Sequence, residues 1–156
     1  MKTELILVGK TNDKHFQTGI DDYCQRIGHY MPFSITVIPE LKNTKSLSFQ
    51  QQKEREGELI LAKLQSSDHV VLLDEHGKDF RSVEFARWIE QKNASVRRLV
   101  FVIGGPYGFS EAVYSRANEK ISLSKMTFSH QMVRLVFVEQ IYRACTIIKG
   151  EPYHHK

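Results

Sequence analysis

The sequence LVFVIGGPYGFS, residues 99–110, begins with the most apolar of the predicted strands and decides the fold class. Residues 99–103 form an unbroken apolar run, which is typical of a short strand buried on both faces of a sheet. Two glycines follow, and Ser110 is placed to cap a short helix. This stretch therefore predicts a strand that ends in a glycine-rich loop and leads into a helix.

The same order of strand, loop and helix recurs on both sides of this stretch. Apolar runs and alternating patterns predict strands at residues 5–8, 33–38, 69–74, 99–103 and 121–123. Polar residues that can cap or begin a helix follow each strand, namely Asp13, Ser48, Ser82, Ser110 and Ser129. The last helix is expected to end near residue 149, where Gly150 can stop it.

Strands that alternate with helices predict an α/β fold with a mainly parallel sheet and helices on both faces. The 156 residues contain no linker or repeat, so we expect one domain that spans residues 1–156. Ligands of such sheets bind at the carboxyl ends of the strands. The segments to inspect are therefore the predicted turn at residues 75–78 and the loops at residues 104–110 and 124–129.

The last predicted helix is apolar on two sides. Val133, Phe137 and Ile141 belong to one apolar stripe, and Leu135 and Val138 belong to another. One stripe can cover the sheet. We expect the other to meet a second copy of the chain, because a helix wrapped on all sides by its own chain needs more residues than this chain offers.

Charge and cysteine content narrow the classes of function. The net charge is +4, and the whole excess lies in residues 115–156, which hold seven basic and three acidic residues. This excess fits a solvated basic face and a polyanion-binding surface about equally well. Cys24 and Cys145 are isolated, and no secretion signal, membrane span or metal-ligand spacing is present, so the sequence predicts a cytoplasmic protein without a bound metal.

The usual nucleotide-binding motifs are missing. The chain has no phosphate-binding loop of the GxxxxGK type, no run of glycines after its first strand and no hydrolase GxSxG motif. Taken alone, GGPYG is a tight turn and SKMTFS a polar loop with a helix cap. Together with Leu73 at the end of a third strand, however, these loops could enclose a nucleoside without phosphates between backbone groups and apolar side chains. S-adenosylmethionine fits that description.

Four ordered motifs carry a more specific resemblance. LDEHGKDFRSVEFA, FVIGGPYGFS, SLSKMTFSHQMVRLVFVEQIYRA and the terminal PYHHK occur at residues 73–86, 101–110, 122–144 and 152–156. In these motifs the chain resembles the RlmH family of the SPOUT superfamily over essentially its whole length. Members of this family methylate N3 of a pseudouridine in large-subunit rRNA, on the assembled ribosome.

The resemblance implies a homodimer whose α/β fold carries a C-terminal trefoil knot. It also implies that three loops bind S-adenosylmethionine. The cofactor-binding residues expected on this basis are Leu73, Gly104, Gly105, Leu123, Ser124, Lys125, Met126, Thr127, Phe128 and Ser129. Many relatives have Leu-Pro-His where this chain has Phe128-Ser129-His130, and Ser129 can compensate for the missing proline by capping the helix.

The C-terminal tail is the expected catalytic segment. The resemblance implies catalytic roles for Tyr153 and His154, and we expect Arg134, His155 and Lys156 to contact RNA. Which tail residue acts as the base stays open, because Glu151 and His155 depart from the family pattern. His130 is interpreted as a helix-start residue bonded within the core.

Two alternatives to the rRNA methyltransferase remain at this stage. One is a SPOUT methyltransferase that acts on another RNA, such as tRNA. The other is a non-catalytic rRNA-binding protein of the same fold.

Overall fold

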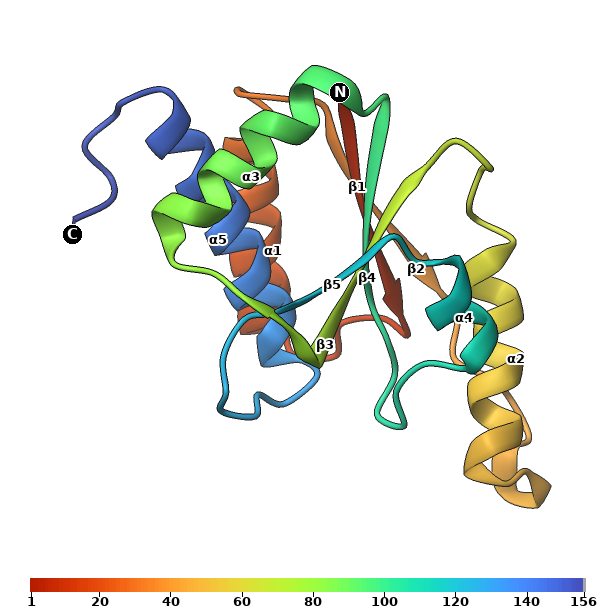
Figure 1. Ribbon diagram of the computed structural model, residues 1–156. Coiled ribbons are helices and arrows are strands. Elements are labelled where there is room, and N and C mark those ends of the chain that lie inside the picture. The colour runs from red at the N-terminus through yellow and green to blue at the C-terminus, as the bar shows by residue number, and fades with distance from the viewer. Residues whose placement is uncertain (156) are drawn as a thin grey trace.

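The computed structural model describes residues 1–155, which contain one five-stranded sheet with all strands parallel (Figure 1). The order across the sheet is β2-β1-β4-β3-β5. The strands are β1 (Lys2–Val8), β2 (Phe33–Ile38), β3 (His69–Asp79), β4 (Arg98–Ile103) and β5 (Glu119–Ser122). The predicted α/β class and strand order along the chain are confirmed, and β4 lies at the centre of the sheet, as its uninterrupted apolar sequence requires.

Helices cover both faces of the sheet, as Figure 1 shows. The described elements are α1 (Lys14–Ile27), the short 3₁₀ helix η1 (Thr44–Ser46), α2 (Phe49–Leu61), α3 (Ser82–Ser95), α4 (Glu111–Arg116) and α5 (Met132–Ile148). Helices α1, α3 and α5 share one apolar core with the sheet, and α2 and α4 share a second core on the opposite face. The sheet therefore lies between two helical layers, and its carboxyl end is left to loops.

Most helix starts lie where local capping predicts them. Asp13 accepts hydrogen bonds from the first turn of α1, Ser48 and Gln51 form a capping box in α2, and Ser110 caps α4. Helix α5 begins later than expected, at Met132, but Ser129 Oγ still accepts a hydrogen bond from Met132 N at 3.1 Å. The capping role predicted for Ser129 is thus retained one turn before the helix.

Strand β3 is longer than the sequence predicted. The segment 75–78, expected to be a turn, belongs to the strand, although the pairing with β5 shifts register between Leu73 and Lys78. Both of these residues pair with Ile121, so the residues between them bulge outward. A Cβ atom at Gly77 would lie 2.6 Å from the backbone of Ile121, which explains the glycine.

Helix α5 packs between α1 and α3 on the sheet (Figure 1). Its two apolar sides are therefore covered largely by its own chain, contrary to our expectation that the chain was too short for this. The homodimer and the trefoil knot stay predictions, and the two-sided burial of α5 no longer argues for the homodimer. Within residues 1–155 no helix is long and apolar enough to cross a membrane.

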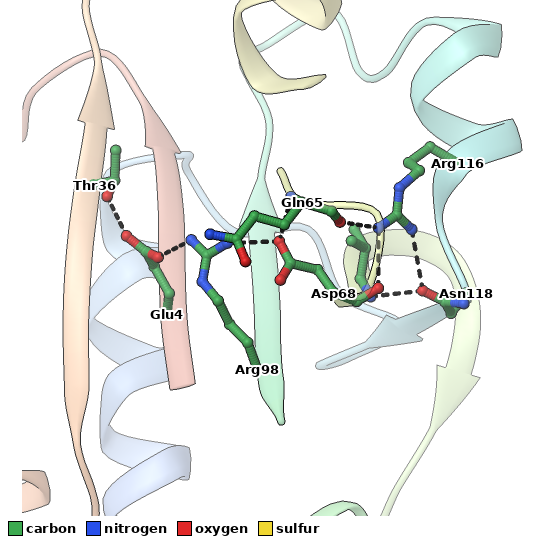
Figure 2. Close-up of polar contacts among 8 residues, drawn as sticks. Glu4, Thr36, Gln65, Asp68, Arg98, Arg116 and Asn118 are labelled. Atoms are coloured by element: carbon green, nitrogen blue, oxygen red, sulfur yellow. Dashed lines mark hydrogen bonds and ion pairs between the residues drawn. The ribbon is translucent and has the colours of Figure 1, made fainter. Parts of the chain in front are cut away.

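A polar network ties the strands together at the amino end of the sheet (Figure 2). Arg98 forms ion pairs with Glu4 of β1 and, at 2.6 Å, with Asp68, which precedes β3. Thr36 of β2 donates a further hydrogen bond to Glu4, while Arg116 donates to the backbone oxygens of residues 65 and 68. These bonds fix the strand ends at the edge of the sheet opposite its carboxyl end, so this network stabilises the fold.

Candidate functional site

Three segments at the carboxyl end of the sheet line a cavity of about 670 Å³. They are the bulged part of β3 and the loops that follow β4 and β5, and they lie along the lower edge of the sheet in Figure 1. All the residues predicted to bind the cofactor line this cavity: Leu73, Gly104, Gly105, Leu123, Ser124, Lys125, Met126, Thr127, Phe128 and Ser129. The structure thus brings together segments that lie about fifty residues apart along the chain.

The glycine-rich loop after β4 packs against α2 and against Phe109, which lies just before α4. A Cβ atom on Gly104 would lie 2.8 Å from the ring of Phe109, so that ring fits beneath the loop only because position 104 has no side chain. Gly108 has a φ of +86°, which glycine adopts without strain. Tyr107 stacks on Phe49 at the start of α2, with 4.1 Å between the ring centroids. These contacts hold the loop in place.

The loop after β5 is held by serines, although it has no glycine. Ser122 Oγ donates to the backbone oxygen of Ser124 at 2.9 Å, and Ser124 Oγ accepts from Met126 N at 2.9 Å. Met126 is 79% exposed, which is unusual for a large apolar side chain. The loop therefore has an ordered backbone and an apolar side chain open to a ligand.

Sequence reasoning missed Tyr114, which lines the cavity from α4. Its hydroxyl donates a hydrogen bond to Asp74 Oδ2, and the other oxygen of Asp74 accepts from His76 N at 2.9 Å. Burial, together with the hydrogen bond and the charge of Asp74, raises the pKa of Tyr114 to about 12. Asp74 is thus a fixed acceptor at the cavity wall. No local pattern in the sequence distinguishes Tyr114 from an ordinary helix-surface tyrosine.

The cavity has the size and lining expected for a nucleoside. Small-molecule sites usually measure about 300–1,000 Å³ and combine apolar walls with a few fixed polar groups. Here Leu73, Ile103 and Phe128 supply apolar surface, while Asp74 and Ser124 supply polar atoms. Gly104 and Gly105 also line the cavity, where they contribute backbone groups only. These groups fit the adenine and ribose of S-adenosylmethionine.

The tail residues Tyr153 and His154 do not line this cavity. Tyr153 packs edge-on against Tyr142 of α5, with 4.7 Å between ring centroids, and its hydroxyl lies 3.4 Å from Glu139 Oε2. His154 Nδ1 lies 3.0 Å from Nη1 of Arg143. Figure 1 shows the C-terminal segment beside the helical layer, apart from the loops at the lower edge. Within one chain, the predicted catalytic residues of the tail therefore lie apart from the cavity that is predicted to bind the cofactor.

The expectation that Arg134 contacts RNA is wrong in this structure. Arg134 is only 1% exposed, and its guanidinium donates to the backbone oxygens of Val8 and Gly9 at 2.8 and 2.9 Å and to Thr11 Oγ1 at 3.0 Å. Burial lowers its pKa, with Glu40 acting in the opposite direction. Arg134 therefore ties the start of α5 to the end of β1.

The remaining predicted residues have varied surroundings. His155 is exposed, as an RNA contact requires, whereas Lys156 lies outside the described residues. His130 is also exposed and lines the cavity, so its interpretation as a core residue is wrong. Within residues 1–155 no group of three or more histidine, cysteine or acidic side chains is placed to hold a metal ion.

Comparison with known proteins gives consistent matches over the full chain. Residues 1–154 match a family model described as a predicted SPOUT methyltransferase. The chain is 66% identical to the ribosomal RNA large subunit methyltransferase H of Bacteroides fragilis, with all of both chains covered. Proteins with the same name from Phocaeicola vulgatus and Flavobacterium johnsoniae are 64% and 57% identical, again over the whole of both chains.

Proposed function

Since the chain belongs to the SPOUT methyltransferase family, we propose that it transfers a methyl group from S-adenosylmethionine to N3 of a pseudouridine in large-subunit rRNA. The observation that carries this proposal is the cavity at the carboxyl end of the sheet, in which the expected cofactor-binding residues from β3 and from the loops after β4 and β5 converge. The names of the similar proteins support the choice of large-subunit rRNA. A ribosomal substrate also supports a cytoplasmic location.

The cavity and the tail have separate tasks in this proposal. When bound, S-adenosylmethionine supplies a methyl group that is already activated by the sulfonium. The residues of the cavity orient that cofactor, and the chain must then place N3 in line with the methyl group and stabilise the ring after N3 loses its proton. Tyr153 and His154 are our candidates for the second task.

A homodimer would reconcile the separated halves of the site. Because the tail packs away from the cavity of its own chain, a second copy could bring its tail to that cavity. We therefore propose a functional homodimer.

The decisive experiment incubates the purified protein and isotope-labelled S-adenosylmethionine with vacant ribosomes, free rRNA or tRNA, and maps the labelled base. We expect label at one pseudouridine of large-subunit rRNA from ribosomes. Label only in tRNA would overturn the substrate. Absence of cofactor binding by calorimetry would favour the non-catalytic RNA-binding alternative.

The tail is tested by Tyr153→Phe and His154→Ala. Both substitutions are expected to abolish turnover while cofactor affinity, measured by calorimetry, changes little, because in this proposal the cavity residues orient the cofactor and the tail acts on the target base. A parallel loss of cofactor affinity and turnover would instead make the tail part of the cofactor site.

A further inference from the structure

His154 makes a hydrogen bond that fixes where its proton lies. Its Nδ1 atom lies 3.0 Å from Nη1 of Arg143. A guanidinium stays protonated at physiological pH and can only donate hydrogen bonds, so Nδ1 must be the acceptor. An imidazolium has no free acceptor nitrogen. This hydrogen bond therefore requires the tautomer that carries its proton on Nε2.

Arg143 is itself held in place by Glu139, one turn earlier in α5. Nε and Nη2 of Arg143 both donate to Glu139 Oε1, at 3.2 and 3.1 Å, and Nη2 also approaches Oε2 at 3.2 Å. The two side chains are only 25% and 18% exposed. The guanidinium also lies over the ring of Tyr153, 4.9 Å from its centroid. This packing leaves Arg143 little freedom to turn away from His154.

The hydroxyl of Tyr153, the other predicted catalytic residue of the tail, is not available as a base either. The Tyr153 hydroxyl lies 3.4 Å from both Glu139 Oε2 and the Tyr23 hydroxyl. Burial, the hydrogen bond with Tyr23 and the charge of Glu139 raise the pKa of Tyr153, while Arg143 acts in the opposite direction. The phenol therefore stays protonated at neutral pH. Other charged groups on this side are Arg26 of α1, which lies over the rings of Tyr23 and Tyr142 and pairs with Asp22, and Glu151, which accepts a hydrogen bond from Tyr30.

We propose that Glu139 and Arg143 are positioning residues that hold His154 as an Nε2–H donor, so that His154 hydrogen-bonds a carbonyl oxygen of the target base instead of removing the N3 proton. This inference rests on the proposed function and identifies the task of His154 in it. In a catalytic triad a carboxylate accepts from the histidine and leaves the other nitrogen basic. Here a cation donates to one nitrogen of the histidine, so the other nitrogen carries the proton and acts as a donor.

The proton balance of the reaction agrees with a donor. N3 lies between two carbonyl groups, so when it releases its proton to water the negative charge is shared with the two carbonyl oxygens. A hydrogen bond from Nε2–H to one of these oxygens stabilises that anion. N3 then forms a bond to the methyl carbon as the bond between that carbon and the sulfonium sulfur breaks, so the ring becomes neutral again and a neutral thioether leaves. No side chain has to accept a proton.

The first test observes the tautomer without any reaction. Long-range proton–nitrogen NMR spectra of protein with isotope-labelled histidine distinguish a protonated ring nitrogen from a bare one, and His154→Gln assigns the signal. We expect a neutral ring with its proton on Nε2 in the cofactor-bound protein at neutral pH. A proton on Nδ1, or on both nitrogens, would overturn the proposal.

The second test exchanges the charges of the pair in the double variant Glu139→Arg, Arg143→Glu. This swap keeps the ion pair on α5 but places a carboxylate next to Nδ1, which moves the proton there and leaves Nε2 basic. We expect kcat to fall on the order of 100-fold, as for the loss of one oxyanion donor, with unchanged cofactor affinity. Preserved or increased kcat in the swapped variant would show that His154 acts as a base.

Two single variants and a control complete the design. Arg143→Lys keeps a cationic donor and should retain kcat within about tenfold, whereas Arg143→Met should lose on the order of 100-fold. Arg55→Met, at an exposed arginine on the opposite helical layer, should leave kcat unchanged. Equal losses in the Lys and Met variants would contradict the donor role of Arg143.

The pH dependence of kcat separates the two roles further. With His154 as a donor, kcat of the wild type rises with pH because N3 must lose its proton to water. A catalytic imidazole base would instead make kcat level off once the imidazole is neutral, usually near pH 6.5. Such a plateau would overturn the inference. Failure of the wild type to methylate any large-subunit rRNA would overturn the proposed function, while the NMR result would still stand.

Discussion

At the scale of single residues, Gly77 shows how closely β3 and β5 approach each other. A Cβ atom there would lie 2.6 Å from both the backbone N and C atoms of Ile121, and a strand backbone cannot move aside as a flexible side chain can. We therefore expect Gly77→Ala to lower the free energy of unfolding by roughly 1–3 kcal/mol. Chemical denaturation measures this change.

The exposed neighbour His76 provides the control for that experiment. Its side chain is 79% exposed, so His76→Ala should change the free energy of unfolding by no more than about 0.5 kcal/mol. Equal stability of the Gly77→Ala protein and the wild type would mean that β3 and β5 are not paired as described.

Arg134 gives a second prediction at this scale. Its guanidinium is the donor for two buried backbone oxygens at the end of β1. Arg134→Met leaves them without this donor and should destabilise the protein by roughly 2–4 kcal/mol. The salt dependence of ribosome binding should stay the same, because no phosphate contact is lost. A shallower salt dependence would restore the RNA-contacting role.

These residues also show what sequence can and cannot predict about the site. The meeting of these segments at one cavity was predictable because the carboxyl ends of parallel strands meet at one edge, whichever side chains they carry. Their cofactor-binding role was implied by the family resemblance and stays a prediction. The burial of Arg134 could not be predicted, because its hydrogen-bond partners are backbone oxygens more than 120 residues away along the chain. The pairing of Arg143 with Glu139 follows helical spacing, but its contact with His154 depends on how the tail folds back.

At the scale of elements, local sequence signals predicted where helices begin better than they predicted how long a strand is. A capping residue such as Asp13 or Ser48 acts on the helix that directly follows it, and both were predicted correctly. The extension of β3 through residues 75–78 was missed because it is created by pairing with β5, a distant segment. Polar, glycine-containing sequence predicts a turn whenever that partner is ignored.

The amino end of the sheet carries a pH-dependent contribution to stability. Burial would raise the pKa of Glu4, but hydrogen bonds from Thr36 and Arg98 and the charge of Arg98 outweigh burial and lower it below the ordinary value of 4.5. The pKa of Glu119 is lowered in the same way, against its burial, by hydrogen bonds from His69, Lys92 and Trp88. Both carboxylates thus favour the folded state when ionised.

A carboxyl group whose pKa is lower in the folded state stabilises the protein above its unfolded pKa, and this contribution is lost as the pH falls through the folded pKa. We therefore expect the denaturation midpoint of the wild type to fall as the pH drops below about 4.5. Glu4→Gln should be less stable at neutral pH and should lose less stability over the acidic range. Parallel curves for the two proteins would contradict the role of Glu4.

At the scale of the whole molecule, the proposed cofactor cavity and the proposed catalytic tail lie apart in one chain. Helix α5 is covered by α1 and α3, so burial alone does not require a partner. The proposed chemistry is the reason to expect one, because the cavity lies at the carboxyl end of the sheet and the tail is held on α5 by Glu139 and Arg143. Sequence patterns could not reveal this separation, since it depends on where residues 150–155 pack.

Mixed dimers test whether the cavity of one chain works with the tail of its partner. Gly105→Val, checked by calorimetry for loss of cofactor binding, removes the cavity function, and His154→Ala removes the tail function. Each variant alone should be inactive.

If tails act across the dimer, half of the randomly mixed dimers regain one working site, so an equimolar mixture should recover roughly a quarter of wild-type activity. If each tail serves its own cavity, no mixed dimer contains an intact site and the mixture stays inactive. Measuring the equimolar mixture before and after the dimers have been allowed to dissociate and re-form controls for subunit exchange, because complementation is expected only afterwards.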